Sequence, residues 1–506
     1  MTRDNDLTET CPAHSGMRAW IGMMLGPLAL LITLVLPPPE GLSVEGWRTA
    51  GVAALMAVFW IAETIPVPVT ALLPLVLFPV LGLGDAKESA APFANPIIYL
   101  FLGGFLIALA MQRWNLHRRV AIALIGYIGT RPASIIAGFL LASALISMWV
   151  SNTATALMML PIATSVIQLL PAEMMRQKPM RDFGTALLLS VAYGATTGGM
   201  ATLIGTPPNA LLAAFVAEVY NIRIGFGQWM LLGVPVVVVT LPLVFLVLTR
   251  VMFHLDREEL PGVAGMLAAE KSKLGRMTRG EITVAVVFVL TALGWIFQPL
   301  LARVIPFVSD TTIAIAGALL LFLIPTNARR GEFVMRWEDA KGLPWGVLLL
   351  FGGGLSLASR IQHHGLATYL GSLAGGLQGL PLMLILMIIT FGILMLTELT
   401  SNTATTATFL PIGGALALSL GQNPLLIMIP IALGANCSYM LPVGTPPNAI
   451  VYGSGLVTLP QMARAGMLLN LLLVPVVVLL LWLLGPVVFG IEIDLLPDWL
   501  GFLPKG

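Results

Sequence analysis

The sequence predicts an all-α polytopic membrane protein built as an inverted repeat, and three observations support this fold class. First, 58% of the 506 residues are hydrophobic and only 10% are charged, with a mean hydropathy of +0.94. Because soluble domains have roughly 25% charged residues, this composition indicates a membrane protein. Second, many apolar runs have the length of a helix. Third, a pair of polar motifs occurs twice, so each half is expected to contain five transmembrane helices plus a re-entrant hairpin.

Several apolar runs along the chain approach the length of about 20 residues that a helix needs to span a bilayer. They cover 19–36, 47–64, 66–83, 97–112, 228–252, 281–299, 310–326, 345–359 and 466–489. Four other apolar stretches are interrupted by Gly, Pro, Ser, Thr and Asn. Of these, 134–171 and 381–420 are expected to be re-entrant hairpins, and 183–217 and 425–458 to be broken helices.

These elements predict a single membrane domain made of two halves behind one extra N-terminal helix. The expected parts are a cytoplasmic tail 1–18, a first helix with an external loop 19–46, repeat 1 over 47–252, a cytoplasmic connecting loop 253–280, repeat 2 over 281–492 and an external tail 493–506. Lys and Arg gather in alternate connections, with six of them between Arg250 and Arg279. The positive-inside rule places such loops in the cytoplasm. We therefore expect the plasma (inner) membrane, with the N-terminus cytoplasmic and the C-terminus external.

Several function classes are excluded by the residues themselves. The chain lacks a GxxxxGK[ST] motif for ATP hydrolysis and an HExxH metal motif, and its five His residues form no ligand pattern. An intramembrane hydrolase would need a nucleophile with His, paired Asp residues or a metal motif. A channel would use rings of carbonyls or charges around a pore. We therefore expect a transporter and no enzyme.

The repeated motifs set the relation between the halves. "SNTATALMMLPI" starts at Ser151 and "SNTATTATFLPI" at Ser401, 250 residues later, while "GTPPNA" occurs at Gly205 and again at Gly444. Each half contains an odd number of spans, so the two copies must lie upside down relative to each other. This is the arrangement of secondary transporters with inverted repeats, which bind their substrates near the middle of the bilayer.

The motifs also predict where the backbone is irregular. Gly-Thr-Pro-Pro cannot continue a helix, because Pro lacks a donor and restricts the residue before it. Ser-Asn-Thr suits a hairpin tip, with Ser and Asn able to cap the following half-helix. Polar groups at this depth are tolerated only where protein covers them or they line a cavity. Half-helix N-termini favour an anion, and free carbonyls with Asn and Ser oxygens suit Na⁺.

Charge counting favours cation coupling. Across the two hairpins and the two broken helices, Glu398 is the only formally charged residue. A dianion with a carboxylate at each end would match the two-fold symmetry but would meet no Lys or Arg there. An uncompensated charge is costly inside a protein, so co-bound cations are the expected compensation. For Glu398 itself, a structural role near the hairpin tip and a direct functional role both remain open.

The paired motifs resemble those of a known family. "SxxxSNTAT…LPI" with "GTPPNA", and "TExxSNTAT…LPI" with "GTPPNA", are similar to the divalent anion:sodium symporter (DASS) family of INDY-type carboxylate transporters. The segment Ala62–Pro79 also resembles the early part of that family, and the resemblance covers about residues 20 to 490. It implies an elevator-type homodimer that moves di- or tricarboxylates, less often sulfate, usually with several Na⁺.

The resemblance also implies the site residues, as two sets related by the repeat. One Na⁺ is expected at Ser147, Ser151, Asn152 and the Gly205 carbonyl, and the other at Thr397, Thr400, Asn402 and the Gly444 carbonyl. At Thr400 the family pattern implies a backbone ligand, so its side chain is incidental. Substrate carboxylates are expected at Asn152, Thr153 and Thr206 in one half, and at Asn402, Thr403 and Thr445 in the other.

The expected function is Na⁺-coupled symport of dicarboxylates of the succinate, malate and fumarate class into the cell. In the expected cycle, at least two Na⁺ bind first and order both tips, and the dianion binds next. The substrate-bearing bundle then moves across a fixed scaffold. The alternatives are a dicarboxylate exchanger without sodium coupling, and a sodium-coupled tricarboxylate or sulfate transporter on the same fold. The expected partners are the anion, Na⁺, the lipid bilayer and a second copy of the chain.

Overall fold

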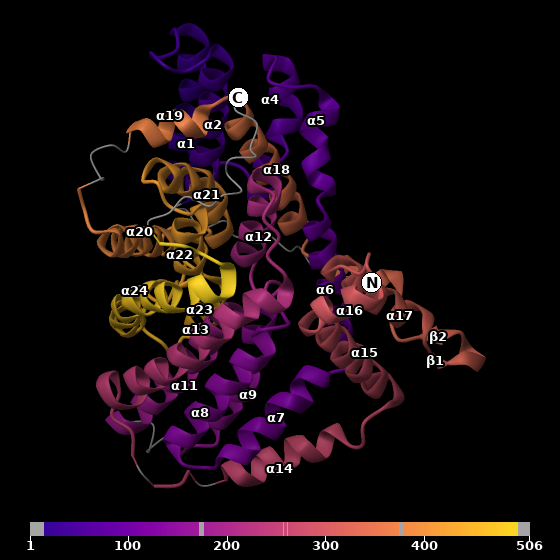
Figure 1. Cartoon of the computed structure of the whole chain (residues 1–506). Coiled ribbons are helices and arrows are strands. Elements are labelled where there is room, and N and C mark those ends of the chain that lie inside the picture. The colour runs from indigo at the N-terminus through magenta and orange to yellow at the C-terminus, as the bar shows by residue number, and fades with distance from the viewer. Residues whose placement is uncertain (1–14, 172–176, 257, 261, 374–378, 494–506) are drawn as a thin grey trace, which may run out of the picture.

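In the computed structural model of the chain, residues 15–171, 177–256, 258–260, 262–373 and 379–493 are described, and they are predominantly helical (Figure 1). Most of the two predicted terminal tails, 1–14 and 494–506, lies outside the described residues. The predominantly helical membrane fold is confirmed. The predicted division into domains stays a prediction.

The first elements include two long helices that pack on each other, α1 and α2. Their bounds and those of the next elements are α1 Ser15–Val35, α2 Val44–Ala62, α3 Val67–Thr70, α4 Leu73–Leu81, α5 Ala86–Ala90, η1 Ala91–Ala94, α6 Pro96–Arg113 and α7 Leu116–Ile128. Ser43 caps α2 through the amide of Gly46. Glu63 ends α2 in the left-handed region, with φ at 49°. The predicted span 66–83 is interrupted after Thr70, because α3 and α4 are separate helices.

The first polar motif lies between two antiparallel helices, and the GTPP sequence lies between two others. These helices are α8 Pro132–Ser147, α9 Asn152–Gln168, α11 Lys178–Gly199 and α12 Pro207–Tyr220, followed by α13 Phe226–Leu246 and η2 Val247–Met252. Thr206 is extended (φ −141°, ψ 146°) and Pro207 starts α12. A residue before Pro is pushed to the extended region, and Pro is favoured at the first helical position. The break in the 183–217 stretch therefore follows from its Pro pair.

The second half begins after a connecting helix, α14 Val263–Leu274. It continues with α15 Arg279–Ile296, α16 Gln298–Val304, α17 Asp310–Leu323, β1 Pro325–Asn327, η3 Ala328–Arg330, β2 Glu332–Phe333, η4 Trp337–Gly342, α18 Trp345–His363 and α19 Leu366–Ser372. The strands β1 and β2 pair antiparallel and are a departure from the expected all-α fold. They form where the chain leaves α17 and reverses through Gly331, whose φ of 63° suits glycine.

The second copies of both motifs occupy matching places. The hairpin consists of α20 Leu382–Thr397 and α21 Asn402–Ser419, the broken helix of α22 Pro424–Asn436 and α23 Pro446–Gly453, and α24 Leu459–Phe489 follows. Thr445 is extended (φ −150°, ψ 142°) and Pro446 starts α23, as Thr206 and Pro207 do in the first half. The same residues thus impose the same backbone break in both halves.

Five of the helices within the described residues are long and apolar enough to cross a membrane. They are Gly16–Val35, Ala86–Arg113, Phe226–Met252, Arg279–Ile296 and Leu459–Phe489, and the first helix of each hairpin, Pro132–Ser147 and Leu382–Thr397, is shorter. Large exposed side chains such as Leu231, Val289 and Leu483 cover their outer faces. This is the exposure pattern of a multi-pass membrane protein, in which lipid covers the outer surface.

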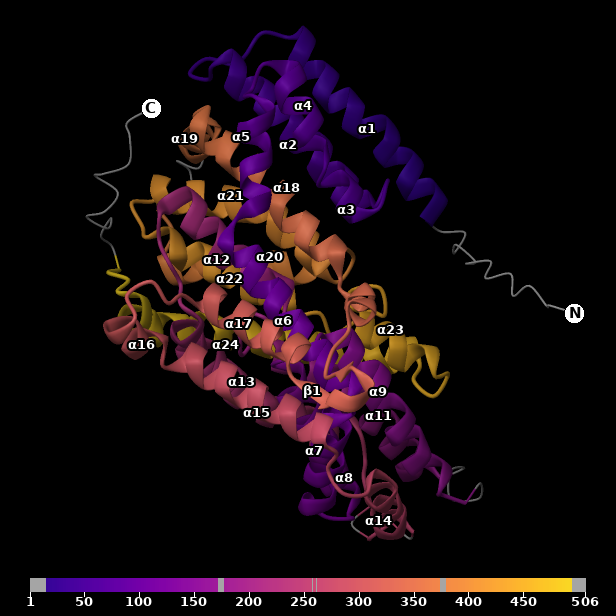
Figure 2. The ribbon, with the colours of Figure 1, turned by 90° about the vertical axis from the view of Figure 1, so that its right-hand side faces the viewer.

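The two hairpins lie at different levels of the molecule. In both views the hairpin α8–α9 lies below the hairpin α20–α21 (Figures 1 and 2). The helices α1 to α5 form the top of the molecule in Figure 2, and α14 lies at the bottom. Each broken helix begins beside the hairpin of its own half, because α11 packs against α8 and α9, and α22 packs against α20 and α21.

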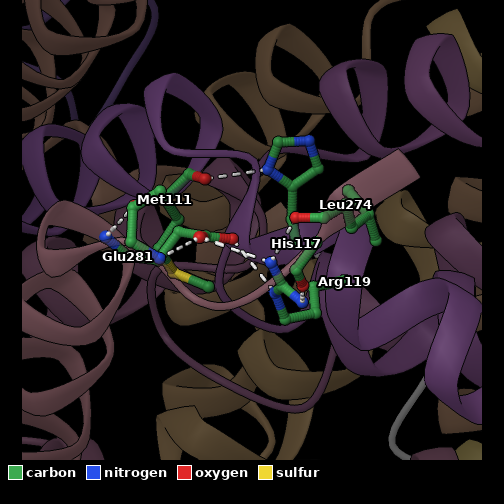
Figure 3. Close-up of polar contacts among 7 residues, drawn as sticks. Met111, His117, Arg119, Leu274 and Glu281 are labelled. Carbon is green, nitrogen blue, oxygen red and sulfur yellow. Dashed lines mark hydrogen bonds and ion pairs between the residues drawn. The ribbon is translucent and has the colours of Figure 1, made fainter. Parts of the chain in front are cut away.

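A cluster of polar contacts attaches the connecting segment to α7 (Figure 3). Arg119 donates to Glu281 on α15 at 3.0 Å and to the carbonyls of Leu274 and Gly275 at the end of α14, also at 3.0 Å. Arg118 pairs with Glu270 of α14 at 2.6 Å. The acidic side chain of Glu270 has its pKa lowered, chiefly by its hydrogen bond with Lys273. Both basic residues of α7 thus hold the segment that joins the two halves.

Candidate functional site

A cavity of about 590 Å³ lies where the two hairpin tips and the two helix breaks meet. Its lining includes Ser151, Asn152, Thr153, Gly205 and Thr206 from the first half, and Ser401, Asn402, Thr403, Gly444, Thr445 and Asn436 from the second half. Helix α6 contributes Phe105 and Gln112 to the wall of the cavity, and the segment directly before α18 contributes Pro344. Segments 250 residues apart in sequence therefore share one chamber.

The first tip is held by its own side chains. Ser151 is the N-cap of α9 and accepts from the amide of Ala154 at 3.4 Å. Ser147, fully buried in the last turn of α8, donates to Oδ1 of Asn152 at 2.6 Å. The Asn152 amide oxygen also lies beside Gly199, where a Cβ atom would approach it to 2.6 Å. Two side-chain oxygens, Ser147 Oγ and Asn152 Oδ1, therefore converge next to the first helix break.

The second tip repeats this pair. Thr397 Oγ1 lies 2.7 Å from Asn402 Oδ1 and 3.0 Å from the carbonyl oxygen of Ala435 on α22. Thr397 thus does for Asn402 what Ser147 does for Asn152. Ser401 stands at the N-cap position of α21 but makes no side-chain cap. Converging hydroxyl and amide oxygens are ligands of the type that hard cations prefer.

The loop at the first helix break is held by neutral groups. Nδ2 of Asn209 donates to the carbonyls of Gly199 and Met200 at 3.3 Å and of Thr202 at 2.9 Å. The hydroxyl of Thr202 accepts from the amide of Gly205 at 3.0 Å. A Cβ at position 205 would collide with the Gly199 carbonyl oxygen, so glycine is needed there.

The loop at the second helix break is held by a carboxylate. Glu398, only 3% exposed, accepts from the backbone amides of three consecutive loop residues at 2.8 to 3.0 Å; these are Tyr439, Met440 and Leu441. It also accepts from Ser438 Oγ at 3.2 Å and from Nδ2 of Asn470 on α24 at 2.7 Å. No ion pair within the described residues includes Glu398. Hydrogen bonds alone therefore satisfy this buried carboxylate.

Most of the predicted site residues line the cavity, and three do not. Those that do are Ser151, Asn152, Thr153, Gly205, Thr206, Asn402, Thr403, Gly444 and Thr445. Ser147 and Thr397 stand directly behind the two Asn residues. The hydroxyl of Thr400 bonds to the Leu396 carbonyl and to Thr405, away from the lining. The predicted ligand assignments themselves stay predictions.

The electrostatics of the cavity agree with the charge count from the sequence. Glu63 is the one charged residue among the lining residues, which belong to the described part of the chain. The hydroxyl of Thr206 is buried and has no hydrogen-bond partner within the described residues. A buried unpaired hydroxyl is costly unless something binds it. The cavity therefore offers polar groups to a ligand but no positive charge.

Sequence reasoning missed three asparagines. Asn436 lines the cavity although it is 2% exposed, and its Nδ2 donates to Oδ1 of Asn209 at 2.8 Å. Asn448 donates to the carbonyls of Ser438 and Leu441 at 3.3 and 3.1 Å. Asn209 and Asn448 belong to the repeated "GTPPNA", so the repeat could have identified them as functional residues. Asn436 is a lone amide in an apolar stretch, which is a weaker indication of function.

Aromatic rings hold the first tip but not the second. Trp149 stacks on Phe226 and on Trp295 with ring centroids 6.1 and 6.5 Å apart, and meets Phe288 edge-on at 5.0 Å. The residue at the same place in the second tip is Leu399, which is 49% exposed. The first tip is therefore docked on α13 and α15 through Trp149, whereas the Leu399 side chain of the second tip is exposed.

Comparison with known proteins gives a match along nearly the whole chain. Residues 17–491 match the sodium:sulfate symporter transmembrane region. The chain is 43% identical over 482 residues to the sodium-dependent dicarboxylate transporter SdcS of Staphylococcus saprophyticus, covering 94% of this chain and 92% of that protein. It is 42% identical over 481 residues to SdcS of Staphylococcus aureus strain USA300, with the same coverage.

Two solved structures share the fold at low sequence identity. The YdaH transporter of Alcanivorax borkumensis gives a TM-score of 0.55 at 14% identity, over 95% of this chain and 99% of that chain. MtrF of Neisseria gonorrhoeae gives a TM-score of 0.55 at 13% identity, over 94% of this chain and 96% of that chain. At this identity they indicate a common transporter fold and carry nothing about substrate.

Proposed function

The chain belongs to the sodium:sulfate symporter family, and from that premise we propose that it imports C4-dicarboxylates of the succinate, malate and fumarate class together with Na⁺. It is a membrane transporter and not an enzyme. The observation that carries the proposal is the shared cavity, in which two Ser-Asn-Thr tips and two helix breaks supply polar groups without a Lys or Arg. A dianion there needs cations from outside the protein.

Two Na⁺ sites are proposed, one per half. One uses Ser147, Ser151, Asn152 and the Gly205 carbonyl, and the other uses Thr397, Asn402 and the Thr400 and Gly444 carbonyls. The converging oxygens of each Ser/Thr–Asn pair support this proposal, because Na⁺ prefers hydroxyl, amide and carbonyl oxygens.

The substrate is proposed to bind between the tips. One carboxylate is held by Asn152, Thr153 and Thr206, and the other by Asn402, Thr403 and Thr445. The unpaired buried hydroxyl of Thr206 supports this arrangement, since a carboxylate oxygen would complete its hydrogen bonding. The amides at the N-termini of α9 and α21 favour an anion in the same place.

The transport cycle is proposed to be of the elevator type, with the two halves as inverted repeats over 47–252 and 281–492. Na⁺ binds first and orders both tips, the dianion binds next, and the bundle of hairpins and broken helices moves across the remaining helices. The matching conformations at Thr206 and Thr445 support a repeated architecture. A homodimer with a cytoplasmic N-terminus and an external C-terminus is part of this proposal.

Uptake into liposomes tests the function directly. We expect the purified protein to accumulate labelled succinate when a Na⁺ gradient points inwards, and not when K⁺ or choline replaces Na⁺. Uptake that needs internal unlabelled dicarboxylate, regardless of Na⁺, would instead identify an exchanger. Citrate or sulfate uptake without succinate uptake would identify a tricarboxylate or a sulfate carrier, and the description of the matching family favours sulfate as the second candidate.

A further inference from the structure

We propose that Asn436 is a positioning residue that couples the two Na⁺ sites, so that filling one site raises the affinity of the other. The inference rests on the proposed function, because it takes the cations as given and asks how the two sites communicate. A chain of hydrogen bonds carries it, joined at one point by the covalent backbone between Ala435 and Asn436. The chain runs from Thr397 and Ala435 in the second half through Asn436 to Asn209 and the Gly199–Gly205 loop in the first half.

The central link joins the two broken helices. Nδ2 of Asn436, the last residue of α22, donates to Oδ1 of Asn209 on α12 at 2.8 Å and to the carbonyl of Ala432 at 3.0 Å. Both amides are buried, Asn436 at 2% and Asn209 at 0% exposure. Losing a buried partner leaves an unsatisfied polar group, so the link is costly to break.

Towards the first site, the orientation of the Asn209 amide is fixed. Its Nδ2 faces three carbonyls, those of Gly199, Met200 and Thr202, so its Oδ1 must face Asn436. These carbonyls belong to the loop that positions Gly205, whose amide bonds to Thr202 Oγ1. Gly205 supplies the carbonyl proposed as a ligand of the first Na⁺. Moving Asn209 therefore moves that ligand.

Towards the second site, the link is a single peptide unit. The carbonyl oxygen of Ala435, directly before Asn436, lies 3.0 Å from Thr397 Oγ1. Thr397 in turn holds Asn402 Oδ1 at 2.7 Å. A cation that fixes Thr397 and Asn402 thus also fixes the end of α22. The end of α22 is where the Asn436 side chain begins.

The link occurs once and not twice, although the halves repeat. At the repeat offset of the GTPPNA motifs, Thr197 takes the place of Asn436 and bonds to the Tyr439 hydroxyl at 2.9 Å. Asn448, which takes the place of Asn209, has its Oδ1 buried without a partner within the described residues. The Thr197 bond also joins the halves, but it ends on a tyrosine hydroxyl and not on the amide that holds a loop. The link between the amides that hold the loops therefore depends on Asn436 itself.

The expected consequence is positive cooperativity. The first cation to bind pays the cost of ordering its own loop and, through Asn436, part of the cost of ordering the other. The second cation then binds to a site that is already ordered, which raises its affinity without any large movement. The effect is reciprocal, because coupling free energies between two binding sites are equal in both directions.

Equilibrium binding of ²²Na⁺ to purified protein without substrate tests the inference, with succinate uptake measured on the same samples. We expect a Hill coefficient above 1 for the unchanged protein, and a fall to about 1, the value for independent sites, in Asn436→Ala. If Asn436→Ala does not fold, Asn436→Thr replaces it. This variant lacks the amide N–H and carries the residue found at the matching place of the first half.

Tyr439→Phe is the matched control, because it removes another hydrogen bond between the two halves, the one with Thr197, and leaves the Asn436–Asn209 link in place. It is expected to keep a Hill coefficient above 1. The inference is overturned if the unchanged protein binds Na⁺ non-cooperatively, if the Asn436 variant keeps its cooperativity, or if Tyr439→Phe loses it equally. Failure of the proposed function is a separate result, namely the absence of Na⁺-driven succinate uptake by the unchanged protein.

Discussion

The two hairpin tips carry nearly the same sequence but are supported in different ways. In the first half, the loop at the helix break is held by the amide of Asn209 and the hydroxyl of Thr202, and Met148 stands behind the tip. In the second half, Glu398 stands at the place of Met148 and accepts from three consecutive loop amides. One geometry of Ser/Thr–Asn pair is thus supported by neutral groups in one half and by a buried negative charge in the other.

The repeated motifs thus give both halves the same tip pair and the same Asn that holds the loop, whereas the remaining support of each loop differs. Irregular backbone at membrane depth needs hydrogen-bond partners, and these partners differ between the two halves. The negative charge of Glu398 lies close to Gly444, where a Cβ atom would come 3.1 Å from its carboxylate. The second cation site is therefore expected to bind Na⁺ more tightly than the first.

The largest loss of transport is expected from replacing Asn152 or Asn402, the asparagine that both tips share. Asn152→Ala and Asn402→Ala should each lower Na⁺-driven succinate uptake by more than about a hundredfold, since each removes a lining amide that ligands are proposed to share. Uptake per reconstituted molecule measures this, with Leu399→Ala as a control on an exposed tip side chain. Near-normal uptake in either variant would remove that Asn from the site.

Replacing Glu398 should separate the tips most clearly. In Glu398→Gln an amide N–H₂ takes the place of one acceptor oxygen and faces backbone N–H donors. We expect the free energy of unfolding to fall by about 3 kcal/mol, since unsatisfied buried groups cost about 1–3 kcal/mol each. Denaturant unfolding in detergent, followed by tryptophan fluorescence, measures this change.

The matched variant in the first tip is Met148→Leu, a swap of similar volume that should cost less than about 1.5 kcal/mol. In addition, Glu398→Gln should raise the Na⁺ concentration for half-maximal uptake, because it removes the charge beside the second site. Equal stability of the Glu398 and Met148 variants would show that the carboxylate is not what holds the second loop.

A smaller effect is expected from making the first tip like the second. Trp149→Leu places in the first tip the residue that the second tip has at Leu399, and it removes three ring contacts. Aromatic pairs contribute about 0.5–1.5 kcal/mol each, so the free energy of unfolding should fall by about 2 kcal/mol. Thermal unfolding, with Leu399→Ala alongside, measures it. A shift no larger than that of the Leu399 variant would argue against docking of the first tip by its aromatic residue.

The smallest effect is expected at Thr400, because the first half already carries the substitution. Its matching residue is Val150, and beside that valine the hydroxyl of Thr155 is buried without a partner within the described residues. Thr400→Val should therefore cost about 1 kcal/mol, the value of one hydrogen bond, and leave the Na⁺ dependence of uptake within about twofold. A large loss of Na⁺ affinity would make the Thr400 hydroxyl a ligand.

The sequence predicted the helical fold and the positions of the two helix breaks, because Gly-Thr-Pro-Pro and Ser-Asn-Thr dictate their own local backbone. Most of the residues that it singled out line the cavity, and their roles as ligands stay predictions. It did not predict Asn436 as a link, since a single amide in an apolar helix has no periodic signal and its partner is 227 residues away. The aromatic support of Trp149 was also invisible. It comes from α13 and α15, elements whose approach depends on tertiary packing.

Arg119 contacts residues on both sides of the turn after α14, which suggests that the protein could be produced as two separate polypeptides. Its guanidinium bonds to the carbonyls of Leu274 and Gly275 before the turn and to the carboxylate of Glu281 after it. A break of the peptide backbone between residues 275 and 278 would leave those contacts intact. The two resulting polypeptides should therefore find each other in the membrane and reconstitute the transporter without a covalent tether.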